Sequence, residues 1–338
     1  MKTYIEKYKA LPVQLKAAIW FLICSFFQKG ISMLTTPIFT RMLSTAEYGK
    51  VSVFTSWYGI ISIFVSLNLS AGVYSRGLVA FESERKKFSS SMQGLNFTLF
   101  VGSVFLYSVF HDFWNSIFSL NTVQMLALLG MVWTSATFSF WAAEQRVTYR
   151  YRLLVLVTVI ASILKPLLSI YLILLSDDKV TARILGLVIV EIIAYTWTFI
   201  YQMYRGKTFF DARFWKHAIL FNLPLIPHYL SQTILNSADR IMIEKIITPE
   251  AAGIYSLAYS LAMIMMLVNN ALSQTLSPWI YTKIRDRKYK EIEPVSYSTL
   301  VMVAVVNIIL IAFAPEVVRL FAPKEYYDAI WCIPPVVM

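Results

Sequence analysis

The sequence predicts an all-α integral membrane protein, a polytopic helical bundle. Hydrophobic residues make up 58% of the 338 residues and charged residues only 14%, against about 45–50% and about 25% in ordinary globular chains. So few charges cannot cover the surface of a soluble protein of this length. Apolar stretches of the length that a membrane helix needs, about 20 residues, recur along the whole chain. The net charge of +11 does not indicate nucleic-acid binding, because the cations lie between apolar stretches and form no single patch.

Nine apolar stretches are long enough to cross a bilayer, and a tenth begins near Ala329. The first has no small-residue cleavage site after it and is predicted to be a retained signal anchor. None alternates with the period of two that a membrane barrel requires. The nine predicted spans are Leu15–Phe39, Val51–Val73, Met92–Phe110, Val123–Ala143, Leu153–Leu175, Ile184–Met203, Ala218–Ile247, Ala251–Leu276 and Val295–Phe313.

The distribution of lysine and arginine predicts the orientation of these spans. Sorting the connections alternately places 20 cations on the side of the amino terminus and 8 on the other side. Short connections rich in lysine and arginine stay in the cytoplasm. We therefore expect a cytoplasmic amino terminus, in the inner (plasma) membrane.

An internal repeat predicts two halves of the same orientation. An offset of 204 aligns Ser44–Gly49 with Thr248–Gly253 and pairs the first span with the seventh. Six spans per repeat predict two pseudo-repeated six-helix lobes, residues 1–210 and 211–338. The second lobe then holds three complete spans and part of a fourth, so we expect the 338 residues to be a fragment of a longer protein.

The repeat also aligns two polar stripes. Ser25, Lys29, Ser32 and Thr36 follow helical spacing in the first span, so they share one face of a helix. The offset of 204 places Tyr229, Thr233, Asn236 and Arg240 on the equivalent face of the seventh span. Stripes of small hydroxyl residues also occur where membrane helices merely pack together. A cation in the stripe is harder to explain by packing alone, because charge inside a bilayer is costly.

Two segments carry a family resemblance. The run from Phe27 to Gly49 (FQKGISMLTTPIFTRMLSTAEYG) and the run from Asn222 to Ser256, with Asn236–Arg240 its most specific part, resemble the opening spans of the two halves of Wzx-type polysaccharide flippases. These belong to the multidrug, oligosaccharidyl-lipid and polysaccharide exporter superfamily. The resemblance implies that the chain moves undecaprenyl-diphosphate-linked oligosaccharide to the outer leaflet by alternating access. The predicted substrate-path residues are Lys29, Arg240, Ser25, Ser32, Thr36, Gln232, Asn236 and Asn270.

Further charges lie inside the predicted spans. Lys165 and Glu191 fall at similar depths in the fifth and sixth spans. They are expected to form a structural ion pair, or a coupling site in which Glu191 binds the ion, or neither. For Arg240 two roles are open, a substrate contact and a local pair with Glu244 one turn later. Asp239 is expected to point elsewhere, as a hinge or coupling candidate.

Nothing in the sequence indicates an enzyme. There is no phosphate-binding loop and no metal-ligand spacing, and no connection is long enough for a soluble catalytic domain. We therefore expect no catalytic residues, metal or cofactor, with H⁺ or Na⁺ as the candidate coupling ions. The expected partners are lipid-linked oligosaccharide, membrane lipids and other membrane proteins of polysaccharide assembly. The alternatives are a drug or lipid-precursor exporter of the same superfamily and, more remotely, a membrane glycosyltransferase or polymerase.

Overall fold

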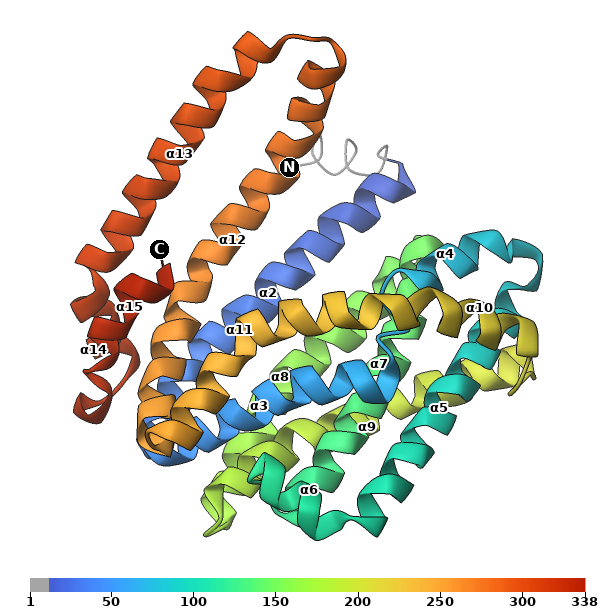
Figure 1. Cartoon of the computed structure of the whole chain (residues 1–338), viewed down its shortest axis with the longest axis horizontal. Coiled ribbons are helices and arrows are strands. Elements are labelled where there is room, and N and C mark those ends of the chain that lie inside the picture. Colours follow the sequence, from blue (N-terminus) through green and yellow to red (C-terminus); the bar gives the residue numbers. More distant parts are fainter. Residues whose placement is uncertain (1–11, 338) are drawn as a thin grey trace, which may run out of the picture. The chain divides into compact units, whose positions relative to one another are not determined.

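The computed structural model describes residues 12–337 of the chain, and in one helix, α12, it leaves undescribed the side chains of residues 264, 267, 268, 270, 271, 274, 275 and 278. Throughout this part the regular structure is helical and no strand occurs (Figure 1). The predicted all-α class is therefore confirmed. The helices are α2 Val13–Met42, α3 Thr45–Ser66, α4 Val73–Ala80, α5 Arg85–Val109, α6 His111–Phe118, α7 Thr122–Val147, α8 Tyr151–Leu175, α9 Lys179–Gly206, α10 Ala212–Asn222, α11 Ile226–Ile246, α12 Pro249–Arg285, α13 Tyr289–Ala312, α14 Ala314–Phe321 and α15 Ala329–Val337, with short 3₁₀ turns at Glu82–Glu84, Leu223–Leu225 and Lys324–Tyr326.

Six helices of the described chain are long and apolar enough to cross a membrane, by length and composition. They are α2, α5 with the turn before it, α7, α8, α9 and α13. These match the first, third, fourth, fifth, sixth and ninth predicted spans. The second, seventh and eighth predicted spans fall on α3, α10 with α11, and α12, which are helical but are not among these six.

The second predicted span ends earlier than expected. It was predicted to continue to Val73, but α3 ends at Ser66. Leu67 and Asn68 both have φ of 48°, a left-handed conformation that breaks a right-handed helix. The side-chain amide of Asn222 donates hydrogen bonds of 2.9 Å to both of their carbonyl oxygens. A residue about 150 positions away in sequence therefore stabilises this break.

The predicted span Ala218–Ile247 is helical up to Ile246, but a 3₁₀ turn interrupts it. α10 ends at Asn222, a 3₁₀ turn covers Leu223–Leu225, and α11 begins at Ile226. Pro224 lies inside the turn. A proline provides no N–H for helical hydrogen bonding, so the α-helical pattern is interrupted here, although Leu223 and Ile226 keep right-handed helical dihedral angles.

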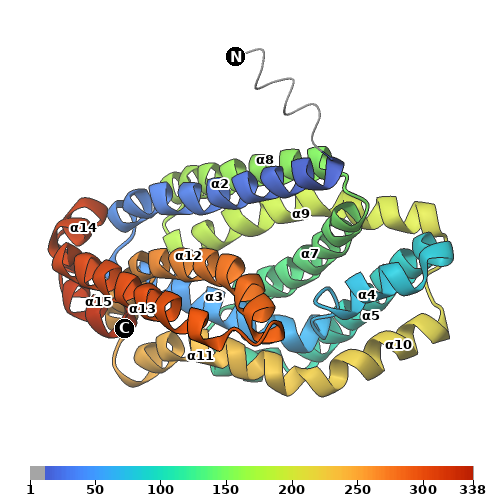
Figure 2. The same cartoon turned by 90° about the horizontal axis from the view of Figure 1, so that it is seen from above.

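The described chain forms two compact units. One comprises residues 12–35 and 53–242, and the other residues 36–52 and 243–337. In the first unit α9 packs along α5, α7 and α8 (Figures 1 and 2). One of its buried clusters is rich in aromatic side chains and includes Tyr74, Phe88, Phe140 and Phe214. The predicted lobe boundary at residue 210 concerns the repeat and stays a prediction.

In the second unit α12 packs against α15. Leu257, Leu261, Val318 and Ile333 belong to its core. The end of α2 is held there by side-chain hydrogen bonds, including one of 2.6 Å from the Thr40 hydroxyl to the carbonyl oxygen of Phe321. Residues of the first predicted span thus belong to two different compact units.

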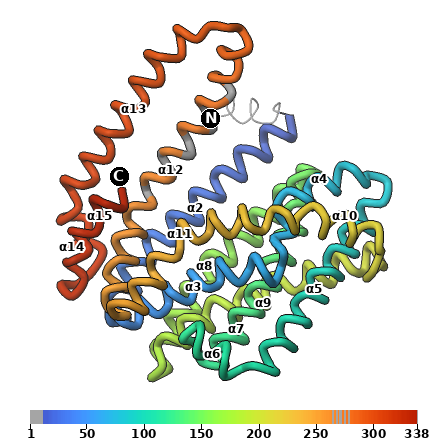
Figure 3. The backbone as a smooth tube through the Cα atoms, viewed as in Figure 1, coloured from blue at the N-terminus to red at the C-terminus, as the bar shows by residue number. Residues whose placement is uncertain are grey.

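The two aligned segments of the repeat form equivalent helix starts in the second unit, where the turns before α3 and α12 lie together (Figure 3). Ser44 and Glu47 form a reciprocal capping pair before α3. Thr248 accepts a hydrogen bond from the Ala251 amide before α12. A hydroxyl residue that accepts from a first-turn amide satisfies a backbone donor that would otherwise lack a partner.

Candidate functional site

Lys165 of α8 and Glu191 of α9 form an ion pair inside the first unit. The Lys165 Nζ lies 2.6 Å from Glu191 Oε1, and the Ser135 hydroxyl donates a 2.7 Å hydrogen bond to Glu191 Oε2. Glu191 is only 3% exposed, so both oxygens of a buried carboxylate are satisfied. Lys165 also lies 5.5 Å from the centre of the Tyr195 ring. The pair therefore joins α7, α8 and α9 through charged and polar groups.

Close packing of α8 and α9 brings Lys165 and Glu191 to the same height along the two helices. A Cβ added at Gly186 would lie 2.6 Å from the backbone nitrogen of Ser169, so only glycine allows the two helices to approach so closely. Lys165 precedes Ser169 by one turn, and Glu191 follows Gly186 by slightly more than one turn. The two helices are antiparallel, so Lys165 and Glu191 lie on the same side of the contact between Gly186 and Ser169. Their distances from this contact along the helix axes differ by about 1.5 Å, which places the two charges side by side.

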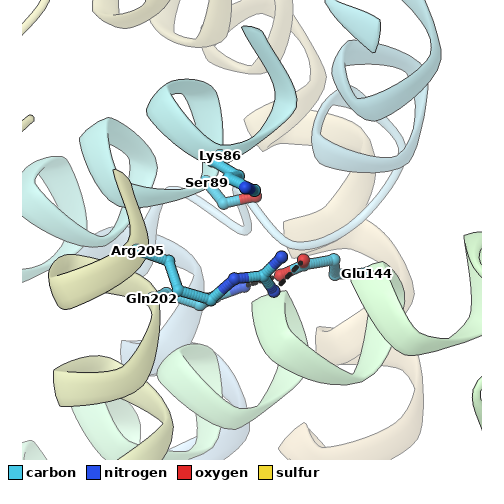
Figure 4. A pocket seen from close by; sticks show the side chains of 5 residues that line it. All are labelled: Lys86, Ser89, Glu144, Gln202 and Arg205. Atoms are coloured by element: carbon cyan, nitrogen blue, oxygen red, sulfur yellow. Dashed lines mark hydrogen bonds and ion pairs between the residues drawn. The ribbon is translucent and has the colours of Figure 1, made fainter. Parts of the chain in front are cut away.

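A second buried carboxylate, which the sequence reasoning missed, lies at one end of the same unit. Glu144 of α7 accepts hydrogen bonds from Gln202 at 2.7 Å and from Arg205 at 3.2 Å, both on α9. These three residues line a shallow crevice together with Lys86 and Ser89 of α5 (Figure 4). Glu144 is 6% exposed. The predicted fourth span ends at Ala143 and Arg205 falls in a predicted connection, so hydropathy alone places both charges outside the membrane.

The polar stripe of α2 is exposed over most of its length. Ser25, Lys29 and Ser32 are exposed, and Thr36 is half-buried. The Ser25 hydroxyl donates to the carbonyl oxygen of Phe21 in its own helix. On the opposite face of α2 large apolar side chains are exposed, among them Leu34, at 74%. α2 therefore presents one polar and one apolar exposed face.

α11 carries the second polar stripe. Gln232 and Asn236 are exposed and Arg240 is half-buried. The Arg240 guanidinium contacts the carboxylate of Asp239 at 3.7 Å and donates to the carbonyl oxygen of Asn236. The expectation that Asp239 points elsewhere is therefore wrong, because the two adjacent charges attract each other. The remaining predicted path residue, Asn270, lies outside the residues whose side chains the structure describes.

Charged groups outside the spans fix the start of α10. The Asp211 carboxylate accepts from the Arg213 backbone amide at 2.9 Å and lies 2.9 Å from its guanidinium. These hydrogen bonds from Arg213 hold the pKa of Asp211 below its usual range. Arg213 also reaches Glu84, 3.4 Å away, so this ion pair links α10 to the segment before α5.

Comparison with known proteins identifies the family. The family model described as "Polysaccharide biosynthesis protein" matches residues 14–282, which is most of the chain. The chain belongs to this family. It is a multi-pass membrane protein, as its apolar helices indicate. The "Lsg locus putative protein 1" of Haemophilus influenzae is 24% identical over 296 residues, which cover 81% of this chain and 67% of that protein.

Solved structures share the fold. A multidrug resistance MATE family transporter of the MOP superfamily, in its inward-facing conformation, matches with a TM-score of 0.61 and 16% identity, over 91% of this chain and 78% of the other. A MOP superfamily transporter from Pyrococcus furiosus matches with a TM-score of 0.57 and 15% identity, over 96% and 77%. The polysaccharide biosynthesis protein described here therefore has the fold of these transporters.

Proposed function

We propose that this family member is a transporter that flips undecaprenyl-diphosphate-linked oligosaccharide from the cytoplasmic to the outer leaflet of the inner membrane, by alternating access. The amino terminus is cytoplasmic in this proposal. The main observation in support of the transport proposal is the exposed cation Lys29. It lies about midway along an apolar helix, on one face with Ser25 and Ser32. An exposed ammonium at this depth is not stable against hydrocarbon, so it faces a water-filled path. There it attracts the diphosphate of the substrate.

The polar face of α11 supports the same proposal. Gln232 and Asn236 are exposed amides on a helix that crosses the predicted membrane region. Side-chain amides both donate and accept hydrogen bonds, as recognition of sugar hydroxyls requires. Family membership supports a role in polysaccharide assembly. The alternative, export of cationic drugs, is less well supported because Lys29 repels cations.

The proposal is tested with Lys29→Ala in cells whose own copy of the gene is deleted. We expect loss of surface glycan and accumulation of lipid-linked oligosaccharide in the inner leaflet, with normal membrane insertion. Lys29→Arg keeps the charge and is expected to retain export. Lys16→Ala, on the same helix but near its first turn, is the matched control and is expected to export normally. Normal surface glycan in cells that carry only Lys29→Ala contradicts the proposal.

A further inference from the structure

One face of α9 carries five polar residues in succession: Glu191, Tyr195, Thr198, Gln202 and Arg205. Their spacing alternates between four and three residues, which keeps them in line on a helix. The first four are 3%, 6%, 0% and 1% exposed. Buried polar groups cost free energy in a membrane protein and commonly mark ion or proton routes. We call this line of residues the α9 ladder.

A carboxylate paired with a cation lies at each end of the ladder. Glu191 pairs with Lys165 at one end. Glu144 pairs with Arg205 at the other, at 3.2 Å. Arg205 follows Glu191 by fourteen positions, which correspond to about 21 Å along the helix. The second pair opens to the crevice that Lys86 lines, at the predicted cytoplasmic end.

Hydroxyl and amide groups occupy the space between the two pairs. The Thr198 hydroxyl donates to the carbonyl oxygen of Tyr195 and keeps its own oxygen available as an acceptor. The Gln202 amide donates to Glu144 at 2.7 Å and to the Tyr74 hydroxyl at 3.2 Å. Tyr74 in turn donates to Ser89 at 2.7 Å, and Ser89 lines the crevice. The hydrogen-bonded part of the line therefore runs from Gln202 through Tyr74 to Ser89, and Glu191, Tyr195 and Thr198 continue it by their position on the same face of α9.

We propose that the α9 ladder is a proton route between Glu191 and the crevice, and that Glu144 is a second proton-binding site on it. A proton on the Glu191 carboxyl leaves along the ladder, Glu144 accepts it as a carboxylate, and the solvent that reaches the exposed Lys86 takes it up. Glu191 is then a carboxylate again and pairs with the Lys165 ammonium. This inference rests on the proposed transport function, to which it adds the path of the coupling ion.

In the part of the chain that the structure describes, the surroundings of each carboxylate do not form a metal site. Glu191 faces Lys165 of α8, Ser135 of α7, Tyr58 of α3 and its own neighbour Tyr195. Around Glu144 the groups are Arg205, Gln202 and Tyr201 of α9, Tyr74 of α4, and Lys86 and Ser89 of α5. A cation already balances each carboxylate, and within the described residues no three His, Cys, Asp or Glu side chains lie together as metal ligands.

The test follows protonation of Glu191 by infrared spectroscopy. The full chain is reconstituted in vesicles sorted so that the Lys86 end faces the outer solution, and the outer pH is lowered. The protonated-carboxyl band that is lost in Glu191→Gln reports on Glu191. We expect Thr198→Val, Gln202→Met and Glu144→Gln each to slow the rise of this band by about tenfold or more, since positioned side chains accelerate proton transfer by at least that factor. Thr198→Ser is expected to restore the rate.

Thr134→Val is the matched control. Thr134 of α7 is also 0% exposed, and its hydroxyl likewise donates to a carbonyl oxygen of its own helix, but it lies off the ladder. Equal rates in Thr198→Val and Thr134→Val, or an unchanged rate in Glu144→Gln, overturn the proton route. The measurement needs no glycan, so its failure is distinguishable from failure of the Lys29 export test.

Discussion

Gly49 and Gly253, which the 204-residue repeat makes equivalent, pack against each other in the second unit. A Cβ at Gly49 would overlap the carbonyl oxygen of Pro249 and approach the Gly253 nitrogen to 2.8 Å. A Cβ at Gly253 would overlap the carbonyl oxygen of Thr45, the repeat partner of Pro249. The contact is thus reciprocal, as in a two-fold symmetric interface. The helix starts that the repeat aligns in sequence meet in space.

This contact predicts opposite effects of alanine at different glycines. Gly49→Ala and Gly253→Ala are each expected to destabilise the protein by about 1–3 kcal/mol, the typical cost of overpacking. Gly102→Ala, in a helix where a Cβ meets nothing within 4 Å, is expected to be neutral or to stabilise by up to about 1 kcal/mol. Thermal melting of the purified variants measures both. Equal melting temperatures for Gly49→Ala and Gly102→Ala would show that the backbone contact is unimportant.

The pair of Lys165 and Glu191 predicts that a double variant regains stability without regaining transport. Lys165→Met or Glu191→Gln alone is expected to cost about 3–5 kcal/mol, because each leaves its partner buried without compensation. The double variant is expected to recover most of this stability but not export. The test measures melting temperature and surface glycan for the unmodified protein, the two single variants and the double variant. Recovery of export in the double variant would make the pair purely structural and would remove Glu191 from the proton route.

Asp211 predicts a pH-dependent contribution to stability. Its pKa is lowered in the folded protein by hydrogen bonds from Arg213, so the unfolded state binds protons more readily. The contribution is therefore present above the ordinary aspartate pKa of about 4 and is lost as the pH falls through the lowered value. At neutral pH, Asp211→Ala is expected to lower stability by about 1 kcal/mol, as for other helix caps. The difference in melting temperature should shrink toward about pH 3; a difference independent of pH contradicts this.

Asn222 predicts a long-range effect on the end of α3. Removing its amide in Asn222→Ala leaves the carbonyl oxygens of Leu67 and Asn68 without these two bonds, and the site is fully buried. A loss of about 1–3 kcal/mol is expected. Hydrogen exchange should increase locally around residues 67–72. Asn121→Ala, which removes the cap of α7, serves as a control, because it should affect that helix start and leave exchange at 67–72 unchanged.

Much of the fold was predictable from local pattern. Apolar stretches of sufficient length predicted all six helices that qualify as membrane spans, because burial of the backbone in lipid requires a helix wherever the side chains are apolar. The repeat motif predicted the equivalent helix starts at Ser44 and Thr248. The stripe on α2 was predictable because helical spacing alone places Ser25, Lys29 and Ser32 on one face.

The crevice was not predictable in the same way. Glu144 and Arg205 lie near the ends of helices that are far apart in sequence, where charged residues are ordinarily exposed. The one sequence feature that indicates this site is the regular spacing of polar residues from Glu191 to Arg205 on α9. That spacing indicates a polar face, but it does not show which helices cover it.

The sequence by itself determined the membrane class, the helices and the faces on which their polar residues lie, since these depend on hydropathy and helical period within one segment. Only the tertiary structure decided where α3 ends, which charges pair, and that Gly49 meets Gly253. Each of these depends on groups brought together from distant positions. Close packing and the need to satisfy buried polar groups select such partners, and neither condition can be evaluated within a single segment.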